Sequence, residues 1–172
     1  SGDMTMETWV KFDNISAQTL MYFSDAGNAN TNNVLYGLRL RDNGNLRYYH
    51  ESGSGVTTDA INFTAVTLTA KDWGHIALVR DVDTNSLKLF LNGQWVETQS
   101  YTNDPDGGAS AELYVGYKSN SASYHMEGQM ADVRIWNTSR TDQEILDNYN
   151  TELTGNQGGN LVLNYKFDDA TG

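Results

Sequence analysis

The chain has 172 residues, enough for one domain with a sizeable core, and we find no internal linker or low-complexity stretch that would divide it. Its formal net charge of −11 argues against general binding to nucleic acid or anionic lipid, because the long-range field repels phosphate. The chain contains 0 cysteines, which excludes a disulfide framework and a thiolate zinc site, and no transmembrane run is present.

A hydrophobic alternation with a period of two predicts a succession of short strands. The first covers Met4 to Phe12, and because both of its faces carry bulky side chains, we expect it to be covered on each side. The polar residues 24–33 predict a loop that is long enough to be functional. A hairpin is then predicted from Val34 to Glu51, with its turn at residues 42–44.

The register of this hairpin decides which side chains share a face. A three-residue loop with Gly44 in the left-handed conformation pairs Leu40 with Leu46, whereas a two-residue turn would mix core and solvent faces. The first register is therefore predicted, and it places Arg39 opposite Arg47. Because like charges directly opposite each other are unfavourable, we expect acidic neighbours or an anionic ligand on that face.

The remaining alternating segments predict further strands at residues 61–69, 73–80, 87–91, 94–98, 113–117, 129–136 and 161–167. The Asn92-Gly93 pair is typical of a two-residue hairpin turn. Thr141 and Glu144 have the spacing of a capping box, so one short helix is predicted near residues 141–150. About ten short strands and one helix indicate an all-β fold, a two-sheet antiparallel sandwich of the jelly-roll type.

Several sequence blocks occur along the chain in a familiar order: METWVKF, LYGLRLRDNGNLRYY, WGHIALVRD, LKLFLNGQWV, LYVGY and GQMADVRIWNTSRTDQEI. In this order the blocks resemble laminin-G-like, or concanavalin A-like, jelly-roll domains, which are related to the pentraxins. The resemblance covers nearly the whole of residues 1–172, so we expect a single domain of this kind. It implies a secreted protein, extracellular or at the cell surface, and binding rather than catalysis.

The C-terminal stretch ELTGNQGGNLVLNYKFDDATG is similar to versions of these domains in large secreted bacterial proteins, where they lie beside glycan-degrading or adhesive domains. Neighbouring domains of a larger secreted chain are therefore expected partners. Nucleic acid and membrane insertion are not expected.

The same fold also supports glycoside hydrolases, which need two carboxylates about 5 Å apart in the retaining case. The chain has no run of alternating acids on one strand that would supply them, and Asp132 is alone in its strand. His50, His75 and His125 are far apart in the sequence, without a nearby nucleophile pattern, and His75 reads as a packed core residue. We therefore predict no catalytic residue and no enzymatic activity.

The resemblance also implies Ca²⁺ as a structural cofactor, for which hard oxygen ligands are required. The matching positions are Asn32 and Asn33, together with the loop at residues 118–125. This loop contains no acid, so Asn32 and Asn33 are the predicted metal ligands. The acidic pairs Asp104 with Asp106 and Asp168 with Asp169 are alternatives, although each can equally be solvated.

Glycan recognition requires aromatic faces for the sugar ring and polar or charged groups for its substituents. Trp9, Trp73 and Trp136 fit core positions better than ligand positions, and ordinary half-buried packing is the alternative for each tyrosine. Ten residues fit a ligand site on a loop or an exposed strand face. They are Arg39, Arg41, Arg47, Tyr49, Trp95, Tyr101, Tyr117, Asn120, Tyr124 and His125.

The arginines among them form the one cationic cluster predicted on this acidic chain, and they suit a sulfated or uronic polysaccharide through bidentate contacts. Ion pairs with surface acids are the alternative. The sequence thus predicts a non-catalytic carbohydrate-binding module for a polysaccharide, with an anionic one expected if the arginine side chains are open to solvent. A protein- or peptide-binding adhesion module and a structural spacer are the other hypotheses.

Overall fold

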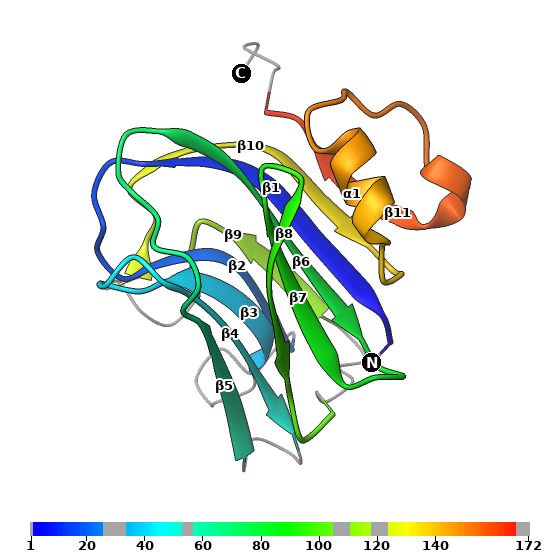
Figure 1. Cartoon of the computed structure of the whole chain (residues 1–172), viewed down its shortest axis with the longest axis horizontal. Helices are drawn as coiled ribbons and strands as arrows, with labels where there is room; N and C mark the ends of the chain where they lie inside the picture. The colour runs from blue at the N-terminus through cyan, green and yellow to red at the C-terminus, as the bar shows by residue number, and fades with distance from the viewer. Residues whose placement is uncertain (1, 26–33, 53–56, 105–110, 118–123, 168–172) are drawn as a thin grey trace. The chain divides into compact units, whose positions relative to one another are not determined.

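The computed structural model describes residues 2–25, 34–52, 57–104, 111–117 and 124–167. Strands dominate this part of the chain, which also contains one α-helix and a short 3₁₀ turn at Gln157–Gly159 (Figure 1). The elements divide between two compact units, one built on a five-stranded sheet and the other on a six-stranded sheet. All strand pairs are antiparallel, so the predicted all-β fold with two antiparallel sheets and one short helix is confirmed, and it is consistent with a jelly roll.

The five-stranded sheet has the order β5-β4-β3-β2-β9. Its strands are β2 (Gln18–Asp25), β3 (Val34–Leu40), β4 (Leu46–Ser52), β5 (Thr57–Phe63) and β9 (Ala111–Val115). The predicted hairpin register is confirmed, because Leu40 pairs with Leu46 and Arg39 lies opposite Arg47. Gly44 has a φ of 80°, the left-handed conformation that this turn needs and that glycine adopts without a steric penalty.

The pleat of this sheet separates a buried face from the face that carries the arginines. Leu38, Leu40, Leu46, Tyr48 and Phe63 are 0% exposed. They alternate along β3, β4 and β5 with more polar residues, as a half-buried sheet requires.

Two predictions for this sheet were wrong. The strand β2 was not predicted, and the strand expected at residues 61–69 is β5, which ends at Phe63. β5 pairs with β4 along its whole length, so the pairing determines its bounds. The next residues are held by loop contacts instead of a ladder, since Asn45 Nδ2 donates to the carbonyl of Val66 and the amide of Leu68 donates to the carbonyl of Gly44.

The six-stranded sheet has the order β11-β10-β1-β6-β7-β8. Its strands are β1 (Met4–Phe12), β6 (Trp73–Asp81), β7 (Ser86–Leu91), β8 (Gln94–Ser100), β10 (Gly128–Trp136) and β11 (Leu161–Tyr165). The hairpin predicted at Asn92-Gly93 is confirmed, because both residues have a positive φ and Leu91 pairs with Gln94.

The helix α1 (Asp142–Asn148) belongs to this unit (Figure 1). The predicted capping box is confirmed, since Thr141 Oγ1 accepts from the amide of Glu144 and the Glu144 carboxylate accepts from the amide of Thr141. Ile145 is 0% exposed and packs with Ala77, Val79 and Phe90. Helix α1 is therefore anchored on one face of the sheet. Among the described residues, no helix is long and apolar enough to cross a membrane.

A buried polar cluster lies within the same unit. Glu7 on β1 is 0% exposed, and its carboxylate accepts a hydrogen bond from Arg140 Nη1 at 2.5 Å. The other carboxylate oxygen lies 3.4 Å from His75 Nε2. Burial raises the pKa of Glu7, but the nearby His75 and the charge of Arg140 outweigh it, so this pKa lies below its usual value. The prediction that His75 is a packed residue is confirmed, since it is 1% exposed.

The tryptophans agree only in part with the predicted core positions. Trp136 is buried, and Trp9 is half-buried, with its Nε1 donating to the carbonyl of Tyr149. Trp73 is 44% exposed, so its predicted core position was wrong. It is the first residue of β6, where neighbouring strands no longer cover the side chain on all sides.

Candidate functional site

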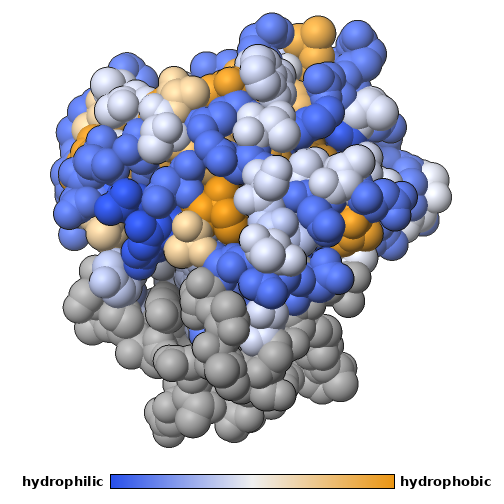
Figure 2. Space-filling model, turned by 60° about the horizontal axis from the view of Figure 1, so that its bottom comes forward, coloured by the Kyte–Doolittle hydropathy of each residue, from blue (hydrophilic) through white to orange (hydrophobic). Residues whose placement is uncertain are grey.

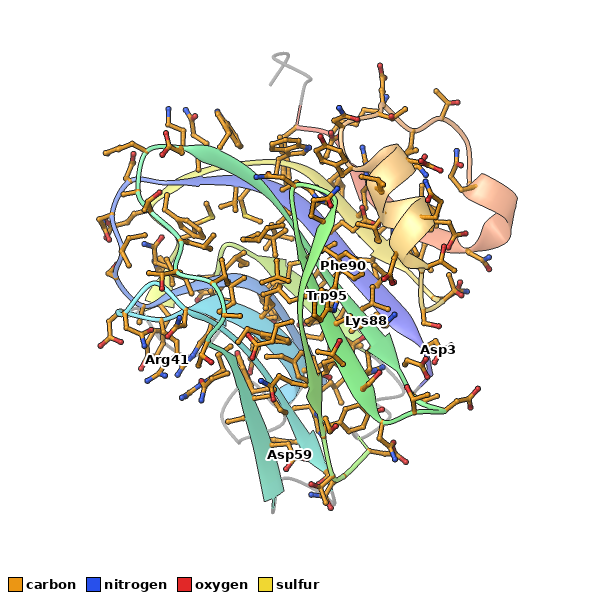
Figure 3. All side chains as sticks on the ribbon, in the orientation of Figure 1. Asp3, Arg41, Asp59, Lys88, Phe90 and Trp95 are labelled. Carbon is orange, nitrogen blue, oxygen red and sulfur yellow. The ribbon has the colours of Figure 1, made fainter. Side chains whose placement is uncertain are left out.

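One face of the five-stranded sheet gathers three cationic side chains. Arg39 on β3 and Arg47 on β4 lie directly opposite each other, and Arg41 immediately follows β3. Asn62 on β5 lies opposite Arg47 on the other side. We call the surface formed by Arg39, Arg41, Arg47, Tyr49 and Asn62 the arginine face. Figure 3 labels Arg41, at the opposite end of this sheet from Asp59.

Hydrogen bonds order two of these arginines through one neutral group. The side-chain oxygen of Asn62 accepts from Arg47 Nε at 2.7 Å and from Arg41 Nη1 at 3.5 Å. The Nε of Arg39 is buried and has no hydrogen-bond partner. Within the part of the chain that the structure describes, no carboxylate forms an ion pair with Arg39, Arg41 or Arg47.

The arginine face is therefore a local concentration of positive charge on a chain whose formal net charge is −11. Burial lowers the pKa of Arg47, and repulsion from Arg39 and Arg41 lowers it further. The Arg47 guanidinium nevertheless remains charged, because the ordinary pKa of arginine is far above neutral pH. An acidic neighbour is present, because the buried Glu51 lies two residues beyond Tyr49 on β4 and acts electrostatically on it. Among the described residues, however, no carboxylate is ion-paired with the three arginines.

Tyr49 lies beside the arginines in an arrangement that depends on a glycine. A Cβ atom at Gly37 would lie 2.7 Å from Tyr49 Cζ and Oη, so only glycine lets this ring lie across β3. The guanidinium of Arg39 lies 5.8 Å from the centre of the Tyr49 ring and 5.3 Å from that of Tyr124. The structure thus brings the predicted residues Tyr49 and Tyr124 together with the arginines.

Aromatic rings continue from Tyr49 across the sheet as a chain of contacts. Ring centres are 6.4 Å apart for Tyr49 and Tyr22, 6.0 Å for Tyr22 and Tyr114, and 5.9 Å for Tyr114 and Tyr117. Tyr117 in turn lies 4.8 Å from His125. We call these five residues the tyrosine row. Of this row, only Tyr49, Tyr117 and His125 were predicted.

Tyr49 and Tyr22, at one end of this row, are neutral. Burial raises the pKa of Tyr22 to about 12, with a further contribution from the nearby Glu51. Burial also raises the pKa of Tyr49, and Tyr22 adds to this effect. Tyr117, at the other end of the row, is 38% exposed. The phenol groups of Tyr22 and Tyr49 therefore keep their protons near neutral pH.

The other predicted ligand residues lie elsewhere or outside the described residues. Trp95 is 55% exposed on β8, in the unit of the six-stranded sheet, and its Nε1 donates to Thr98 Oγ1 (Figure 3). Tyr101 is 5% exposed and its ring packs edge-on against His50, so the packing alternative holds for it. Asn120 lies outside the described residues.

The predicted metal ligands, Asn32 and Asn33, also lie outside the described part of the chain. Within residues 2–25, 34–52, 57–104, 111–117 and 124–167, no group of three or more histidine, aspartate or glutamate side chains could hold a metal ion. Calcium binding therefore stays a prediction.

Sequence reasoning missed Asn62, Tyr22 and Tyr114. One signal for Tyr22 was present, since Leu20 to Phe23 is a continuous apolar run of the kind found in covered strands. Gly37 in the middle of a predicted strand was a second signal, because it marks the close approach of another group. The position of Asn62 follows only from the pairing of β5 with β4.

Comparison with known families identifies the family of the fold. A laminin-G family model, described as the concanavalin A-like lectin/glucanases superfamily, matches residues 1–146. The chain belongs to this superfamily. The resemblance predicted from the sequence blocks is thus confirmed. A search of curated protein sequences found no significant match.

Three solved structures illustrate the likeness. A Bacteroides ovatus protein with an inferred carbohydrate-binding role has a TM-score of 0.71 and 22% identity, and the match covers 98% of this chain and 46% of that one. The Ruminococcus gnavus IT-sialidase CBM40 bound to α2,3-sialyllactose has a TM-score of 0.67 and 15% identity, with 85% and 82% covered. A heptameric SAP-like pentraxin from Limulus polyphemus has a TM-score of 0.60 and 13% identity, with 84% and 68% covered.

These likenesses show the fold. This lectin-like chain spans about half the length of the Bacteroides ovatus protein.

Proposed function

We propose that the chain is a non-catalytic carbohydrate-binding module of a secreted bacterial protein, and that it binds an anionic polysaccharide at the arginine face. The observation that carries this proposal is the pairing of Arg39 with Arg47 across two strands, with Arg41 close by and no ion-paired carboxylate among the described residues. An anionic ligand would relieve the repulsion that this arrangement creates.

The chemistry of the face suits such a ligand. Guanidinium groups bind carboxylate or sulfate oxygens through two parallel hydrogen bonds, which adds geometric specificity to the charge. At the accessible end of the tyrosine row, Tyr117 and His125 offer exposed rings for the apolar side of a sugar, whereas Tyr22 and Tyr49 are buried and support the row from within the sheet. Charge and stacking are therefore available side by side on one sheet.

Two further observations support a glycan over a protein partner. On the surface drawn in Figure 2, hydrophobic side chains form small, separate patches among hydrophilic ones, whereas protein-binding sites are commonly larger apolar patches. Structures similar in fold include a protein with an inferred carbohydrate-binding role and a CBM40 solved with sialyllactose.

The test is affinity electrophoresis of the domain through gels that contain a uronic, a sulfated or a neutral polysaccharide. An anionic polysaccharide is expected to retard the wild-type domain, and the double variant Arg39→Ala with Arg47→Ala is expected to lose that retardation. The matched control is Lys88→Ala with Lys166→Ala. It removes the same charge from ion pairs with Asp142 and Glu152 in the other unit and should bind normally.

Retained retardation of the double arginine variant would remove the arginine face from consideration while leaving carbohydrate binding in place. The absence of retardation by every polysaccharide would contradict the carbohydrate-binding proposal itself. That result would favour the adhesion-module or spacer hypothesis.

A structural Ca²⁺ is a separate proposal, for which only the family resemblance argues. It is tested by metal removal, below.

A further inference from the structure

Asn62 accepts hydrogen bonds from two of the three arginines with a single neutral oxygen. We propose that Asn62 is a positioning residue that sets the anion specificity of the arginine face, because it fixes two guanidinium groups without cancelling their charge. This inference rests on the proposed function and adds to it a specificity-determining residue.

The hydrogen-bond geometry determines which edges of the arginines remain available. Arg47 donates from Nε to Asn62 at 2.7 Å, so its terminal edge, Nη1 and Nη2, makes no hydrogen bond to the residues that the structure describes. The terminal edge is one of the two that a carboxylate or sulfate can bind through two parallel hydrogen bonds. Arg41 donates from Nη1 at 3.5 Å, which leaves its Nε and Nη2 edge. Asn62 thus orients both guanidinium groups and leaves one edge of each for an anion, the Nη1 and Nη2 edge of Arg47 and the Nε and Nη2 edge of Arg41.

The choice of an amide at this position has an electrostatic consequence. Arg39, Arg41 and Arg47 repel one another, and that repulsion is part of the reason why the pKa of Arg47 is lowered. An aspartate of the same shape at residue 62 would accept charge-assisted hydrogen bonds from Arg47 and Arg41, which are stronger than those of an amide. The free protein would then be more stable, but a bound anion would meet a carboxylate.

Stability and anion binding should therefore change in opposite directions when Asn62 becomes acidic. If Asn62 only supported the fold, stability and affinity would change together. An aspartate that stabilised the fold would then leave anion binding intact. This opposition separates a positioning role from a structural one. It also fits the general observation that functional sites keep interactions that are not optimal for stability.

The experiment compares the wild-type domain with Asn62→Asp, Asn62→Ala and the control Asn85→Asp. Asn85 is exposed in the turn between β6 and β7, so its replacement makes the same change in net charge in the other unit. Thermal unfolding reports on stability. Titration with polygalacturonate and, separately, with heparin reports on affinity, and the salt dependence of each affinity reports on the charge that the ligand meets.

Asn62→Asp is expected to raise the melting temperature and to weaken binding of the anionic glycan by roughly 100-fold, since like charges placed across an interface cost several kcal/mol. Its affinity should also depend less on salt. Asn62→Ala is expected to weaken binding by roughly tenfold through the lost orientation, with the salt dependence of the wild type. Asn85→Asp should leave stability and affinity unchanged.

An Asn62→Asp variant that binds as well as the wild type would overturn the inference, and so would one that loses binding together with stability. In either case, loss of binding in the Arg39→Ala, Arg47→Ala variant would leave the proposed function standing. If the wild type bound neither polygalacturonate nor heparin, the proposed anionic ligand would fail, and this inference would fail with it.

Discussion

The buried ion pair between Glu7 and Arg140 offers a demanding test of the fold. Arg140 is 5% exposed, and its guanidinium serves three groups at once. Nη1 donates to the Glu7 carboxylate at 2.5 Å, Nη2 donates to the carbonyl of Glu144 at 2.9 Å, and Cζ lies 4.0 Å from the Trp136 ring centre. Replacement of Arg140 by methionine keeps most of the apolar volume and leaves the charge of Glu7 buried without its partner.

The expected loss of stability is large for a single substitution. Removal of one member of a buried pair costs about 3–5 kcal/mol, because the other charge stays in a low-dielectric environment. In a chain of this size, 1 kcal/mol corresponds to about 2–4 °C in melting temperature, so a fall of roughly 6–20 °C is expected.

The pH dependence follows from the pKa of Glu7. In the wild type this pKa is lowered, so the carboxylate contributes stability above the ordinary value of 4.5, and this contribution is lost as the pH falls through the lower, folded-state pKa. In Arg140→Met, burial acts with less opposition and raises the pKa. The difference in stability between the two proteins should therefore shrink as the pH falls from neutral toward and below 4.5.

Thermal unfolding followed by circular dichroism, at neutral and at acidic pH, measures both effects. The double variant Glu7→Gln with Arg140→Met should lie closer to the wild type than Arg140→Met alone, since both charges are gone. Lys88→Met is the control. It breaks an exposed pair with Asp142 and should cost under about 1 kcal/mol. A cost below about 1 kcal/mol for Arg140→Met, or a double variant no better than the single one, would refute this reasoning.

Three further predictions concern the site, the helix and the cofactor. Gly37→Ala should displace the Tyr49 ring, because the added Cβ would lie 2.7 Å from it. The domain should remain folded, and glycan binding measured by titration should weaken by roughly tenfold or more. Thr141→Ala removes the capping-box hydroxyl that accepts from the amide of Glu144 and should cost about 1 kcal/mol in chemical unfolding. Removal of metal with EDTA should lower the melting temperature if native-state Ca²⁺ is present, and an unchanged curve without metal in elemental analysis would contradict the calcium proposal.

Part of the candidate site follows from local sequence rules alone. The Asp-Asn-Gly turn determines the register of the β3–β4 hairpin, and the register places Arg39 opposite Arg47 on the face away from Leu38 and Tyr48. The capping box at Thr141 and the turn at Asn92-Gly93 are equally local. In each case a few residues adjacent in the sequence determine the local conformation.

The rest depends on which strands become neighbours. Tyr22 and Tyr114 meet because β2 pairs with β9, although these strands are far apart in the sequence. Asn62 reaches the arginines because β5 pairs with β4 as far as Leu46 and Phe63, and no local pattern predicts that extent. The partner of Glu7 comes from a segment beyond β10, so a lone acid in a strand with bulk on both faces could not be recognised as half of a buried pair.

The sheet orders also have a consequence for how the chain folds as it is synthesised. The strands β2 to β5 pair with their immediate successors and can form ladders as soon as they are made. β1, which is made first, must wait for β6 on one edge and for β10 on the other.

Until β10 emerges from the ribosome, β1 is an edge strand with bulky apolar side chains, the kind of segment that pairs with the wrong chain. Glu7 lies in the middle of it. A charge in an open edge discourages such pairing, and Arg140 neutralises that charge only after β10 has taken its place. We therefore expect Glu7, whose buried charge makes the finished core sensitive to loss of Arg140, to reduce mispairing of β1 in the unfinished chain.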